Sequence, residues 1–262
     1  MHAQPGVAIS PDTPVSESES DRREQRYLPA SSFRSRRSAL SDAQRKVWER
    51  RWPDLGLSLG EAPEGRVQPL DTAAWFGRQA PVVLEIGCGS GTSTLAMAKE
   101  EPGIDVIAVE IYRRGLAQLL NGIDRDQIGN IRLIRGNGIE VLQRLVAPGS
   151  LTGVRVFFPD PWPKARHHKR RFLQTGTIGL IADRLLGGGV LHVATDHAGY
   201  ADHIAEVGDA EPLLRRADPG SELPISIERP ITKYENKGRD AGSVINEFIW
   251  VKPEIGPETG DK

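Results

Sequence analysis

The sequence predicts an α/β domain built on a mostly parallel, seven-stranded sheet with an antiparallel edge strand and helices on both faces. From about residue 80, short apolar runs alternate with helix-like segments, the order expected of a parallel sheet. The first five runs are almost continuously apolar, as in strands covered on both faces. The last two leave no room for a long helix between them, so we expect them to pair antiparallel at one edge. The predicted strands span 81–87, 105–111, 131–136, 154–160, 189–196, 224–229 and 246–253, and the predicted helices span 92–101, 112–122, 138–146, 169–186 and 197–207.

Composition narrows the class of protein. The chain has 262 residues, 38% of them hydrophobic, and a formal net charge of −1, so an anionic partner must be met by local patches. The single cysteine, Cys88, excludes an intramolecular disulfide framework. No apolar run is long enough for a transmembrane helix, and the first residues lack the apolar core of a signal peptide. We therefore expect a soluble, cytoplasmic protein.

The N-terminal region changes from a polar tail to a basic segment. Between residues 22 and 51 there are ten Lys and Arg against three acids, a local balance of +7. Ser41 and Gln44 predict a capping box at the start of a helix, and Pro53 is expected to end it. We expect this segment to bind RNA, although its charge could serve only to keep the chain in solution. The predicted division is a disordered tail (1–30), a basic arm with a helix (31–60), the main domain (61–253) and a second tail (254–262).

Three glycines follow the first predicted strand. In LEIGCGSGTST (84–94), Gly87, Gly89 and Gly91 allow a tight turn in which backbone can approach a ligand. Glu110 ends the second predicted strand, where an acid can hold both hydroxyls of a ribose. A turn without a ligand would also need glycine, but the placement of Glu110 favours a nucleoside site.

The glycine spacing indicates which kind of nucleoside. Dinucleotide sites use G-x-G-x-x-G, whereas this loop reads G-x-G-x-G and is preceded by Glu85. A carboxylate at that point repels a diphosphate and suits a ligand that carries an ammonium or a sulfonium group.

An acid, a tryptophan and a basic run follow the fourth predicted strand. In RVFFPDPWPKARHHKRRF (155–172), Asp160 falls at the same sheet edge as the glycine loop, where open α/β sheets bind ligands. Its carboxylate can accept from N1–H and N2 of guanine, and Trp162 offers a flat face to a base. Five of the eight residues from Lys164 to Arg171 are Lys or Arg, at the start of the next predicted helix, and can hold phosphates. Alternatively, Asp160 is a helix cap, Trp162 lies in the core and the basic run is a solvated face. The two adjacent histidines lack ligand spacing to other residues, so no metal site is predicted.

The loop at 84–94 resembles motif I of the class I S-adenosylmethionine methyltransferases, which reads E/D-x-G-x-G-x-G. RGNGIEVL (135–142) resembles the segment of that superfamily that contacts adenine, with Asn137 where many members have Asp. The resemblance implies a Rossmann-like class I methyltransferase fold and S-adenosyl-L-methionine as cofactor.

A closer resemblance covers residues 30–252. FPDPWPKARHHKRR is similar to the signature of the bacterial tRNA (guanine-N7)-methyltransferases, and TKYENKGRDAG (232–242) is similar to their second signature, T-K-[FY]-E…G. ATDHAGYADHI (194–204) and the basic segment at 32–57 also match. The family transfers a methyl group to N7 of guanine 46 in the tRNA variable loop.

This resemblance implies a set of site residues, with Asp160 as the catalytic residue and no metal. It implies cofactor contacts from Glu85, Gly87, Gly89, Gly91, Glu110, Asn137 and Asp160. It implies substrate contacts from Lys164, Asp196, Thr232, Lys233, Tyr234 and Glu235, although Asp196 and Glu235 could have structural roles instead. It implies RNA contacts from Arg166, His167, His168, Lys169, Arg170 and Arg171.

Three other functions remain as alternatives to tRNA guanine-N7 methylation. Methyltransferases that act on exocyclic base amines carry Asn/Asp-Pro-Pro-aromatic here, and this turn is one proline short. A non-catalytic RNA-binding module on a decayed methyltransferase fold is disfavoured by the intact glycine loop and its acids. A nicotinamide dehydrogenase is disfavoured by the glycine spacing. Both a monomer and a homodimer are compatible with the sequence.

Overall fold

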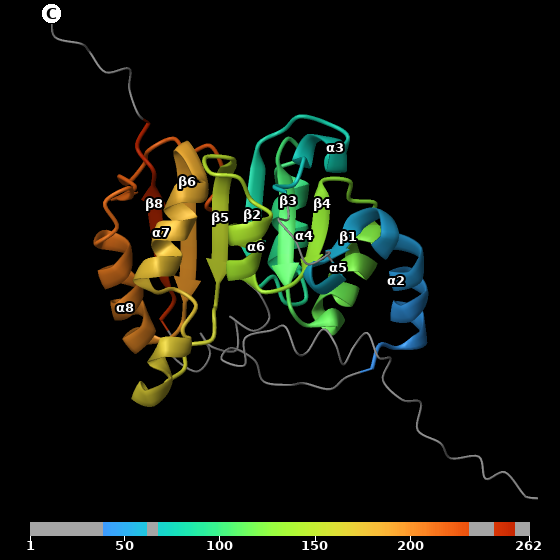
Figure 1. Cartoon of the computed structure of the whole chain (residues 1–262), viewed down its shortest axis with the longest axis horizontal. Coiled ribbons are helices and arrows are strands. Elements are labelled where there is room, and N and C mark those ends of the chain that lie inside the picture. Colours follow the sequence, from blue (N-terminus) through green and yellow to red (C-terminus); the bar gives the residue numbers. More distant parts are fainter. Residues whose placement is uncertain (1–38, 62–67, 231–243, 255–262) are drawn as a thin grey trace, which may run out of the picture.

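The computed structural model describes residues 39–61, 68–230 and 244–254, which build a sheet with helices on both faces (Figure 1). Within these residues the sheet has eight strands in the order β1-β4-β3-β2-β5-β6-β8-β7. Strands β1 to β6 run parallel to their neighbours, and β8 is antiparallel to both β6 and β7. The strands are β1 (Gly56–Ser58), β2 (Val82–Ile86), β3 (Asp105–Glu110), β4 (Ile131–Arg135), β5 (Leu151–Phe157), β6 (Leu185–Thr195), β7 (Arg215–Arg216) and β8 (Asn246–Val251).

The helices cover the two sheet faces with separate clusters of buried side chains. One face packs against α6, α7 and α8, and the half of the other face around β3 and β4 packs against α2, α4 and α5. Helix α5 shows why: Leu116, Leu119, Leu120 and Ile123 recur at helical spacing and are all buried. The helices are α2 (Asp42–Leu55), α3 (Thr72–Phe76), α4 (Thr92–Glu100), α5 (Arg113–Asp126), α6 (Gly138–Arg144), α7 (Thr175–Arg184) and α8 (Ala198–Asp209), with 3-10 helices η1 (Leu59–Glu61) and η2 (Ala165–Arg170).

The mostly parallel sheet with an antiparallel strand near one edge was predicted correctly, but the count of seven strands was wrong. The structure adds β1, which pairs with β4. It also replaces the predicted strand at 224–229 with β7, because the backbone of that segment has side-chain partners. Ser226 donates its N–H to Glu101 Oε1 at 2.7 Å, and its carbonyl accepts from Arg155 at 3.1 Å. The segment lies on the sheet face, with Ile225 buried near Val83 and Val190.

Several predicted helix boundaries differ from the structure, for example the end of α5 at Asp126 instead of residue 122, and two of the differences have a clear physical reason. The helix expected at 169–186 begins only at Thr175, because the basic run forms η2 with its own i to i+3 hydrogen bonds, such as His167 N–H to the Lys164 carbonyl at 2.8 Å. Pro53 does not end α2 but lies in its last turn. Its missing N–H costs one helical bond there, and the helix closes with Gly56 N–H on the Trp52 carbonyl.

The part of the basic arm that the structure describes is packed into the fold. The predicted capping box is confirmed, since Ser41 and Gln44 exchange side-chain to backbone bonds. Trp48 is 7% exposed, stacks on Trp52 with centroids 4.0 Å apart, and contributes to the core beneath α5. Arg50 makes a two-pronged ion pair with Asp124 of α5. Helix α2 thus shares its core with the sheet, while the proposed division at residues 60 and 61 stays a prediction.

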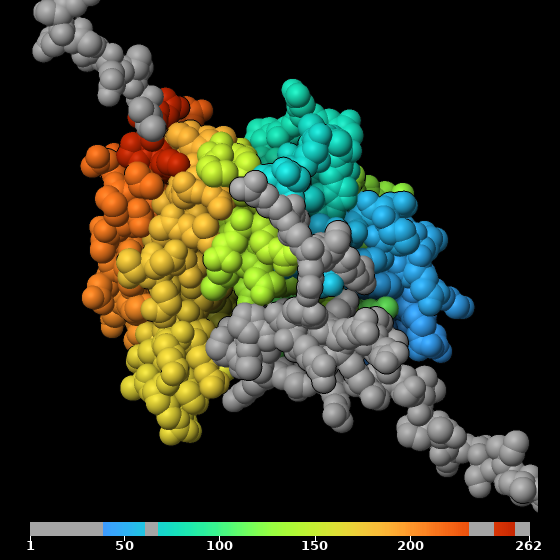
Figure 2. Space-filling view, viewed as in Figure 1, coloured from blue at the N-terminus to red at the C-terminus, as the bar shows by residue number. Residues whose placement is uncertain are grey.

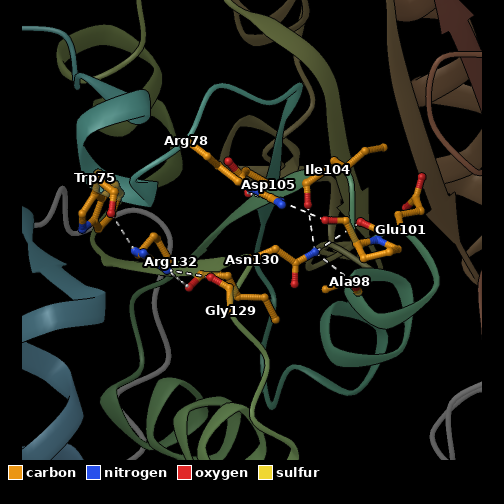
Figure 3. A network of polar contacts seen from close by, with 11 residues as sticks. Trp75, Arg78, Ala98, Glu101, Ile104, Asp105, Gly129, Asn130 and Arg132 are labelled. Atoms are coloured by element: carbon orange, nitrogen blue, oxygen red, sulfur yellow. Dashed lines mark hydrogen bonds and ion pairs between the residues drawn. The ribbon is translucent and has the colours of Figure 1, made fainter.

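Polar contacts fix the amino ends of β3 and β4. The Asn130 amide lies within hydrogen-bond distance of the carbonyls of Ala98, Glu101 and Ile104 (Figure 3). Arg78 pairs with buried Asp105 at 2.6 Å. These contacts anchor the end of α4 and the starts of both strands, so the opposite ends of the strands are held in register.

Candidate active site

Two buried acids lie at the carboxyl ends of neighbouring strands. Glu85 is on β2 and is 3% exposed, and Glu110 is the last residue of β3 and is 8% exposed. The strands pair in parallel, with Ile86 opposite Val109, so both acids face the same edge of the sheet. This is the lower edge in Figure 1, where the parallel strands point.

The glycine loop takes the conformation that its sequence predicts. Gly87, Gly89 and Gly91 have φ angles of 81°, 55° and 75°, the left-handed region that favours glycine. Gly91 is the N-cap of α4. A Cβ added at Gly87 or Gly89 would meet no atom of the described residues within 4 Å, which leaves open space above the loop.

Glu110 is held by the loop itself. Its carboxylate accepts N–H bonds from Gly89 at 3.0 Å, Ile111 at 2.7 Å and Tyr112 at 3.0 Å. Burial raises the pKa of Glu110, these three donors oppose the rise, and the negative charge of Asp160 adds to it. The shape of the glycine loop and the orientation of this acid are therefore coupled.

Glu85 is the acid with an unsatisfied atom. Its Oε2 is buried and has no hydrogen-bond partner in the described part of the chain. Burial raises the pKa of Glu85, and the charge of Arg155 and the nearby Thr94 hydroxyl, which itself makes no hydrogen bond within the described residues, oppose the rise. Arg155 is opposite Glu85 in the β2–β5 pairing. A buried carboxylate with a vacant acceptor position suits a cationic donor from a ligand.

Sequence reasoning missed Arg155, which acts on Glu85, and Gly115, which lies against the glycine loop. Arg155 is fully buried, donates to Glu101 at 2.5 Å and is opposite Glu85 in the sheet, where its positive charge lowers the pKa of that acid. It was hidden in a strand that otherwise reads as apolar. Gly115, in the first turn of α5, lies against the loop: a Cβ there would be 2.4 Å from the Gly89 carbonyl oxygen. The sequence signal that could have found Gly115 was a glycine early in a predicted helix, where glycine lowers the helix propensity.

Asn137 follows β4 at the same edge and caps α6. It is 7% exposed, and its Oδ1 accepts from Ile139 N–H at 2.8 Å. A carbonyl oxygen has a second lone pair, so the cap leaves Asn137 able to accept from an adenine amine.

Asp160 lies on an exposed loop three residues beyond the end of β5, and not at the end of the strand itself as predicted. It follows β5, which runs parallel to β2, so it lies at the same sheet edge as Glu85 and Glu110, and its charge raises the pKa of both Glu110 and Tyr200. Phe158 and Trp162 have φ angles of 51° and 43°, a strained region for such side chains that is common at functional loops. The prolines do not set the loop shape alone.

The basic residues of η2 surround Trp162. The Arg170 guanidinium lies 5.1 Å over the indole ring, and the His167 ring meets it edge-on at 5.6 Å. Desolvation lowers the pKa of His167, and the charges of Arg170, Arg166 and Lys164 lower it further. Lys164, Arg166 and Lys169 are exposed. Figure 2 shows this yellow region projecting from the lower edge of the molecule.

Arg171 differs from the rest of the basic run. It is 5% exposed, donates to the carbonyls of Pro161 at 2.9 Å and Gly199 at 3.2 Å, and lies over the Tyr200 ring. It also contacts His168 at 3.2 Å. The guanidinium therefore joins the Asp160 loop to α8, whereas the neighbouring cations face solvent.

The predicted substrate residues are only partly described. Asp196 directly follows β6 and is half-buried at the same edge, and Lys164 immediately precedes η2. Thr232, Lys233, Tyr234 and Glu235 lie outside the described residues. Among the described residues, no group of three or more His, Cys, Asp or Glu could hold a metal ion, and no helix is both long and apolar enough to span a membrane.

The residues at this edge fit the predicted cofactor. Glu85 presents an unpartnered buried carboxylate oxygen, the glycine loop leaves open space, and Glu110 and Asn137 stand at the ends of the next two strands. A family model described as "Putative methyltransferase" matches residues 79–248. The fold and the site thus define a class I methyltransferase that uses S-adenosyl-L-methionine.

Comparison with known proteins narrows this class. The chain is 73% identical over 254 residues to the tRNA (guanine-N(7)-)-methyltransferase of Mycolicibacterium paratuberculosis, covering 96% of this chain and 97% of that protein. It is 62% identical over 270 residues to the protein of the same name from Mycobacterium ulcerans, with the same two coverages. The chain belongs to the tRNA (guanine-N(7)-)-methyltransferase family. Among solved structures, an rRNA methylase from Streptococcus thermophilus matches 67% of this chain and 88% of its own at a TM-score of 0.45 and 14% identity.

Proposed function

We propose that this protein transfers the methyl group of S-adenosyl-L-methionine to N7 of guanine 46 in the tRNA variable loop. The observation that carries the proposal is that the cofactor acids and the Asp160 loop, with its basic η2, lie at one edge of the sheet. The names of the relatives support tRNA as the substrate. A cytoplasmic location fits a tRNA substrate and is part of the proposal.

In this proposal the cofactor is held by the glycine loop and three side chains. The Glu85 carboxylate accepts from the ammonium of the methionine part, which satisfies its vacant oxygen. Glu110 accepts from one ribose hydroxyl with the acceptor position left on Oε2, since Oε1 already accepts two backbone N–H bonds and Oε2 one. Asn137 meets the adenine amine. Gly87, Gly89 and Gly91 let the backbone approach the ligand.

Asp160 is proposed to orient the base. When bound, the cofactor would supply an electrophilic methyl group on a sulfonium, and methyl transfer to the N7 lone pair would leave the positive charge on the guanine. N7 carries no proton, so no general base is needed, and catalysis depends on position and electrostatics. The exposed Asp160 carboxylate can accept from N1–H and N2 and balance the charge that develops on the base.

The tRNA is proposed to lie along η2. The exposed cations Lys164, Arg166 and Lys169 can contact phosphates, which position the RNA without reading its sequence. Trp162, with Arg170 on its ring, offers an extended flat surface to a base pulled from its stack. We also propose substrate contacts from Asp196 and from Thr232, Lys233, Tyr234 and Glu235, and RNA contacts from His167, His168 and the basic arm.

Nucleoside mass spectrometry tests this proposal. Unmodified tRNA transcripts are incubated with the protein and S-adenosyl-L-methionine, and we expect 7-methylguanosine that disappears when guanine 46 is replaced. The Asp160→Ala variant should lose nearly all turnover, while its cofactor affinity changes only modestly. An N2-methylated product would favour an exocyclic-amine methyltransferase. Cofactor binding with no methylated product would favour a binding module. Asp160→Ala activity within a few-fold of the unaltered protein would contradict the role of that residue.

A further inference from the structure

Arg229 is a buried cation that the proposed mechanism does not use. Its side chain is 3% exposed, and Nη2 lies 2.7 Å and Nε 3.2 Å from Oε1 of Glu247 on β8. Burial of a guanidinium is unfavourable unless the charge is paired and well placed. The position therefore needs an explanation beyond filling space.

The ion pair joins two points of the chain that flank a predicted substrate segment. Arg229 comes three residues before Thr232, the first of four predicted substrate contacts, and Glu247 comes 12 residues after Glu235, the last of them. Residues 231–243 lie outside the described residues. Glu247 is opposite Ala194 of β6, two positions before Asp196. Arg229 and Glu247 therefore join two described parts of the chain near the carboxyl end of β6.

The same guanidinium contacts the segment that leads to Asp160. It lies 5.5 Å from the ring centroid of Phe157 and 5.0 Å from that of Phe158. Phe158 is the strained residue with φ of 51°, and its N–H bonds to the Ala194 carbonyl at 2.8 Å. Arginine lying over two aromatic rings restrains them by cation–π contact and by packing.

The pair is charged at neutral pH. His192, whose Nε2 is 3.5 Å from Glu247 Oε2, and Arg229 lower the pKa of Glu247 to about 2. His192 also meets the Phe157 ring edge-on at 4.9 Å. The contact is therefore a permanent restraint and not a pH switch.

We propose that Arg229 is a positioning residue for methyl transfer. Through its ion pair with Glu247 on β8, it restrains the Phe157–Phe158 segment that leads to Asp160. This inference rests on the proposed function. It assigns to a residue outside both signatures the task of holding the Asp160 segment in one arrangement against β8.

Arg216 offers a matched control on the opposite face of β8. It makes a two-pronged ion pair with Asp209 at 2.6 and 2.9 Å and lies over the rings of Phe248 and Trp250 at 5.1 and 4.9 Å. Each arginine thus pairs with an acid and lies over two rings, although the Arg216 side chain is 45% exposed, and of the two only Arg229 lies against the segment that leads to Asp160.

The test compares R229M, E247Q and R216M in single-turnover methylation of tRNA at saturating cofactor, with separate titrations of cofactor and tRNA and a thermal unfolding curve. We expect R229M to slow the methyl-transfer step at least tenfold while the cofactor Kd stays within about twofold. R216M should keep the rate within about twofold even where it lowers the Tm. Because either single variant already removes the ion pair, the double variant R229M/E247Q should slow the step by less than the product of the two single effects. R229K should recover part of the rate, since it keeps the charge but not the planar fork.

Several outcomes overturn the inference. A methyl-transfer rate for R229M equal to that of R216M would show that Arg229 only stabilises the fold. If R229M does not fold, E247Q carries the test, because its side chain is 37% exposed, and an unchanged E247Q rate refutes the positioning role. If the unaltered protein binds cofactor but forms no 7-methylguanosine, both the proposed function and this inference are wrong. If the unaltered protein is active and R229M methylates tRNA at the same rate, only this inference is wrong.

Discussion

Replacing Gly115 by alanine tests whether the contact between α5 and the glycine loop shapes the cofactor site. The added Cβ would lie 2.4 Å from the Gly89 carbonyl oxygen and 3.0 Å from its carbon. Carbon and oxygen approach no closer than about 3.3 Å in ordinary contacts, so the two backbones must separate by about 1 Å. The Gly89 N–H that bonds Glu110 moves with that carbonyl.

The expected magnitude follows from two opposing effects. Overpacking a tight site costs about 1–3 kcal/mol, and alanine gains about 1 kcal/mol over glycine in a helix. The net loss of stability should therefore be about 0–2 kcal/mol. Without cofactor, the Gly115→Ala variant can relieve the strain by moving the glycine loop. Cofactor binding must then restore the original geometry of that loop. A cost of about 1–3 kcal/mol at that step raises the cofactor Kd about 5- to 150-fold.

Isothermal titration of the cofactor measures this effect, with Gly176→Ala as the control. Gly176 also lies in the first turn of a helix, but a Cβ there meets no described atom within 4 Å. The control should gain up to about 1 kcal/mol of stability and bind cofactor normally. A Gly115→Ala Kd within about twofold of the original would refute the reasoning, since it would mean that the loop tolerates the shift.

Cofactor affinity should fall as the pH is lowered, beginning at a higher pH than for exposed acids, because burial raises the pKa of Glu85 and Glu110 above the ordinary 4.5 and protonation removes the charges proposed to hold the ligand. Glu85→Gln should flatten this titration, and a Kd that stays constant as the pH is lowered would contradict it. Trp48→Ala should cost about 3–5 kcal/mol in urea unfolding, since a large side chain leaves the core; a decrease below about 1 kcal/mol would show that α2 docks weakly. Removing residues 1–20 should leave tRNA binding unchanged, whereas removing 1–38, with six further arginines, should weaken it. The slope of log K against log salt concentration should also become shallower by about 0.9 for each phosphate that the arm no longer neutralises. Equal tRNA binding by both truncated proteins would exclude a role of residues 21–38 in tRNA binding.

The sequence predicted the features that depend on local rules. The positive φ angles of the glycine loop, the capping box at Ser41 and the clustering of Glu85, Glu110 and Asp160 at one sheet edge follow from residue type and from the parallel topology. Each of these requires only a few neighbouring residues or the rule that parallel strands end on the same side.

The features that were missed depend on partners far away in the chain. The I-S-I alternation at 225–227 looks like a strand, but Glu101 and Arg155 take the hydrogen bonds of Ser226. Gly115 matters only because α5 meets the glycine loop 26 residues earlier, at Gly89. Arg171 looks like one more phosphate ligand until its carbonyl partners are known. Periodicity and composition carry no information on such contacts.

The place of β8 in the sheet has a consequence for synthesis of the protein. Among the described strands it comes last along the chain, yet it lies between β6 and β7, with Trp250 fully buried. Until β8 has been synthesised and has left the ribosome, the long edge of β6 has no partner and resembles the open edges that recruit other chains. The sheet therefore closes only after its last described strand has emerged, and until then nascent chains on one messenger are at risk of pairing with each other.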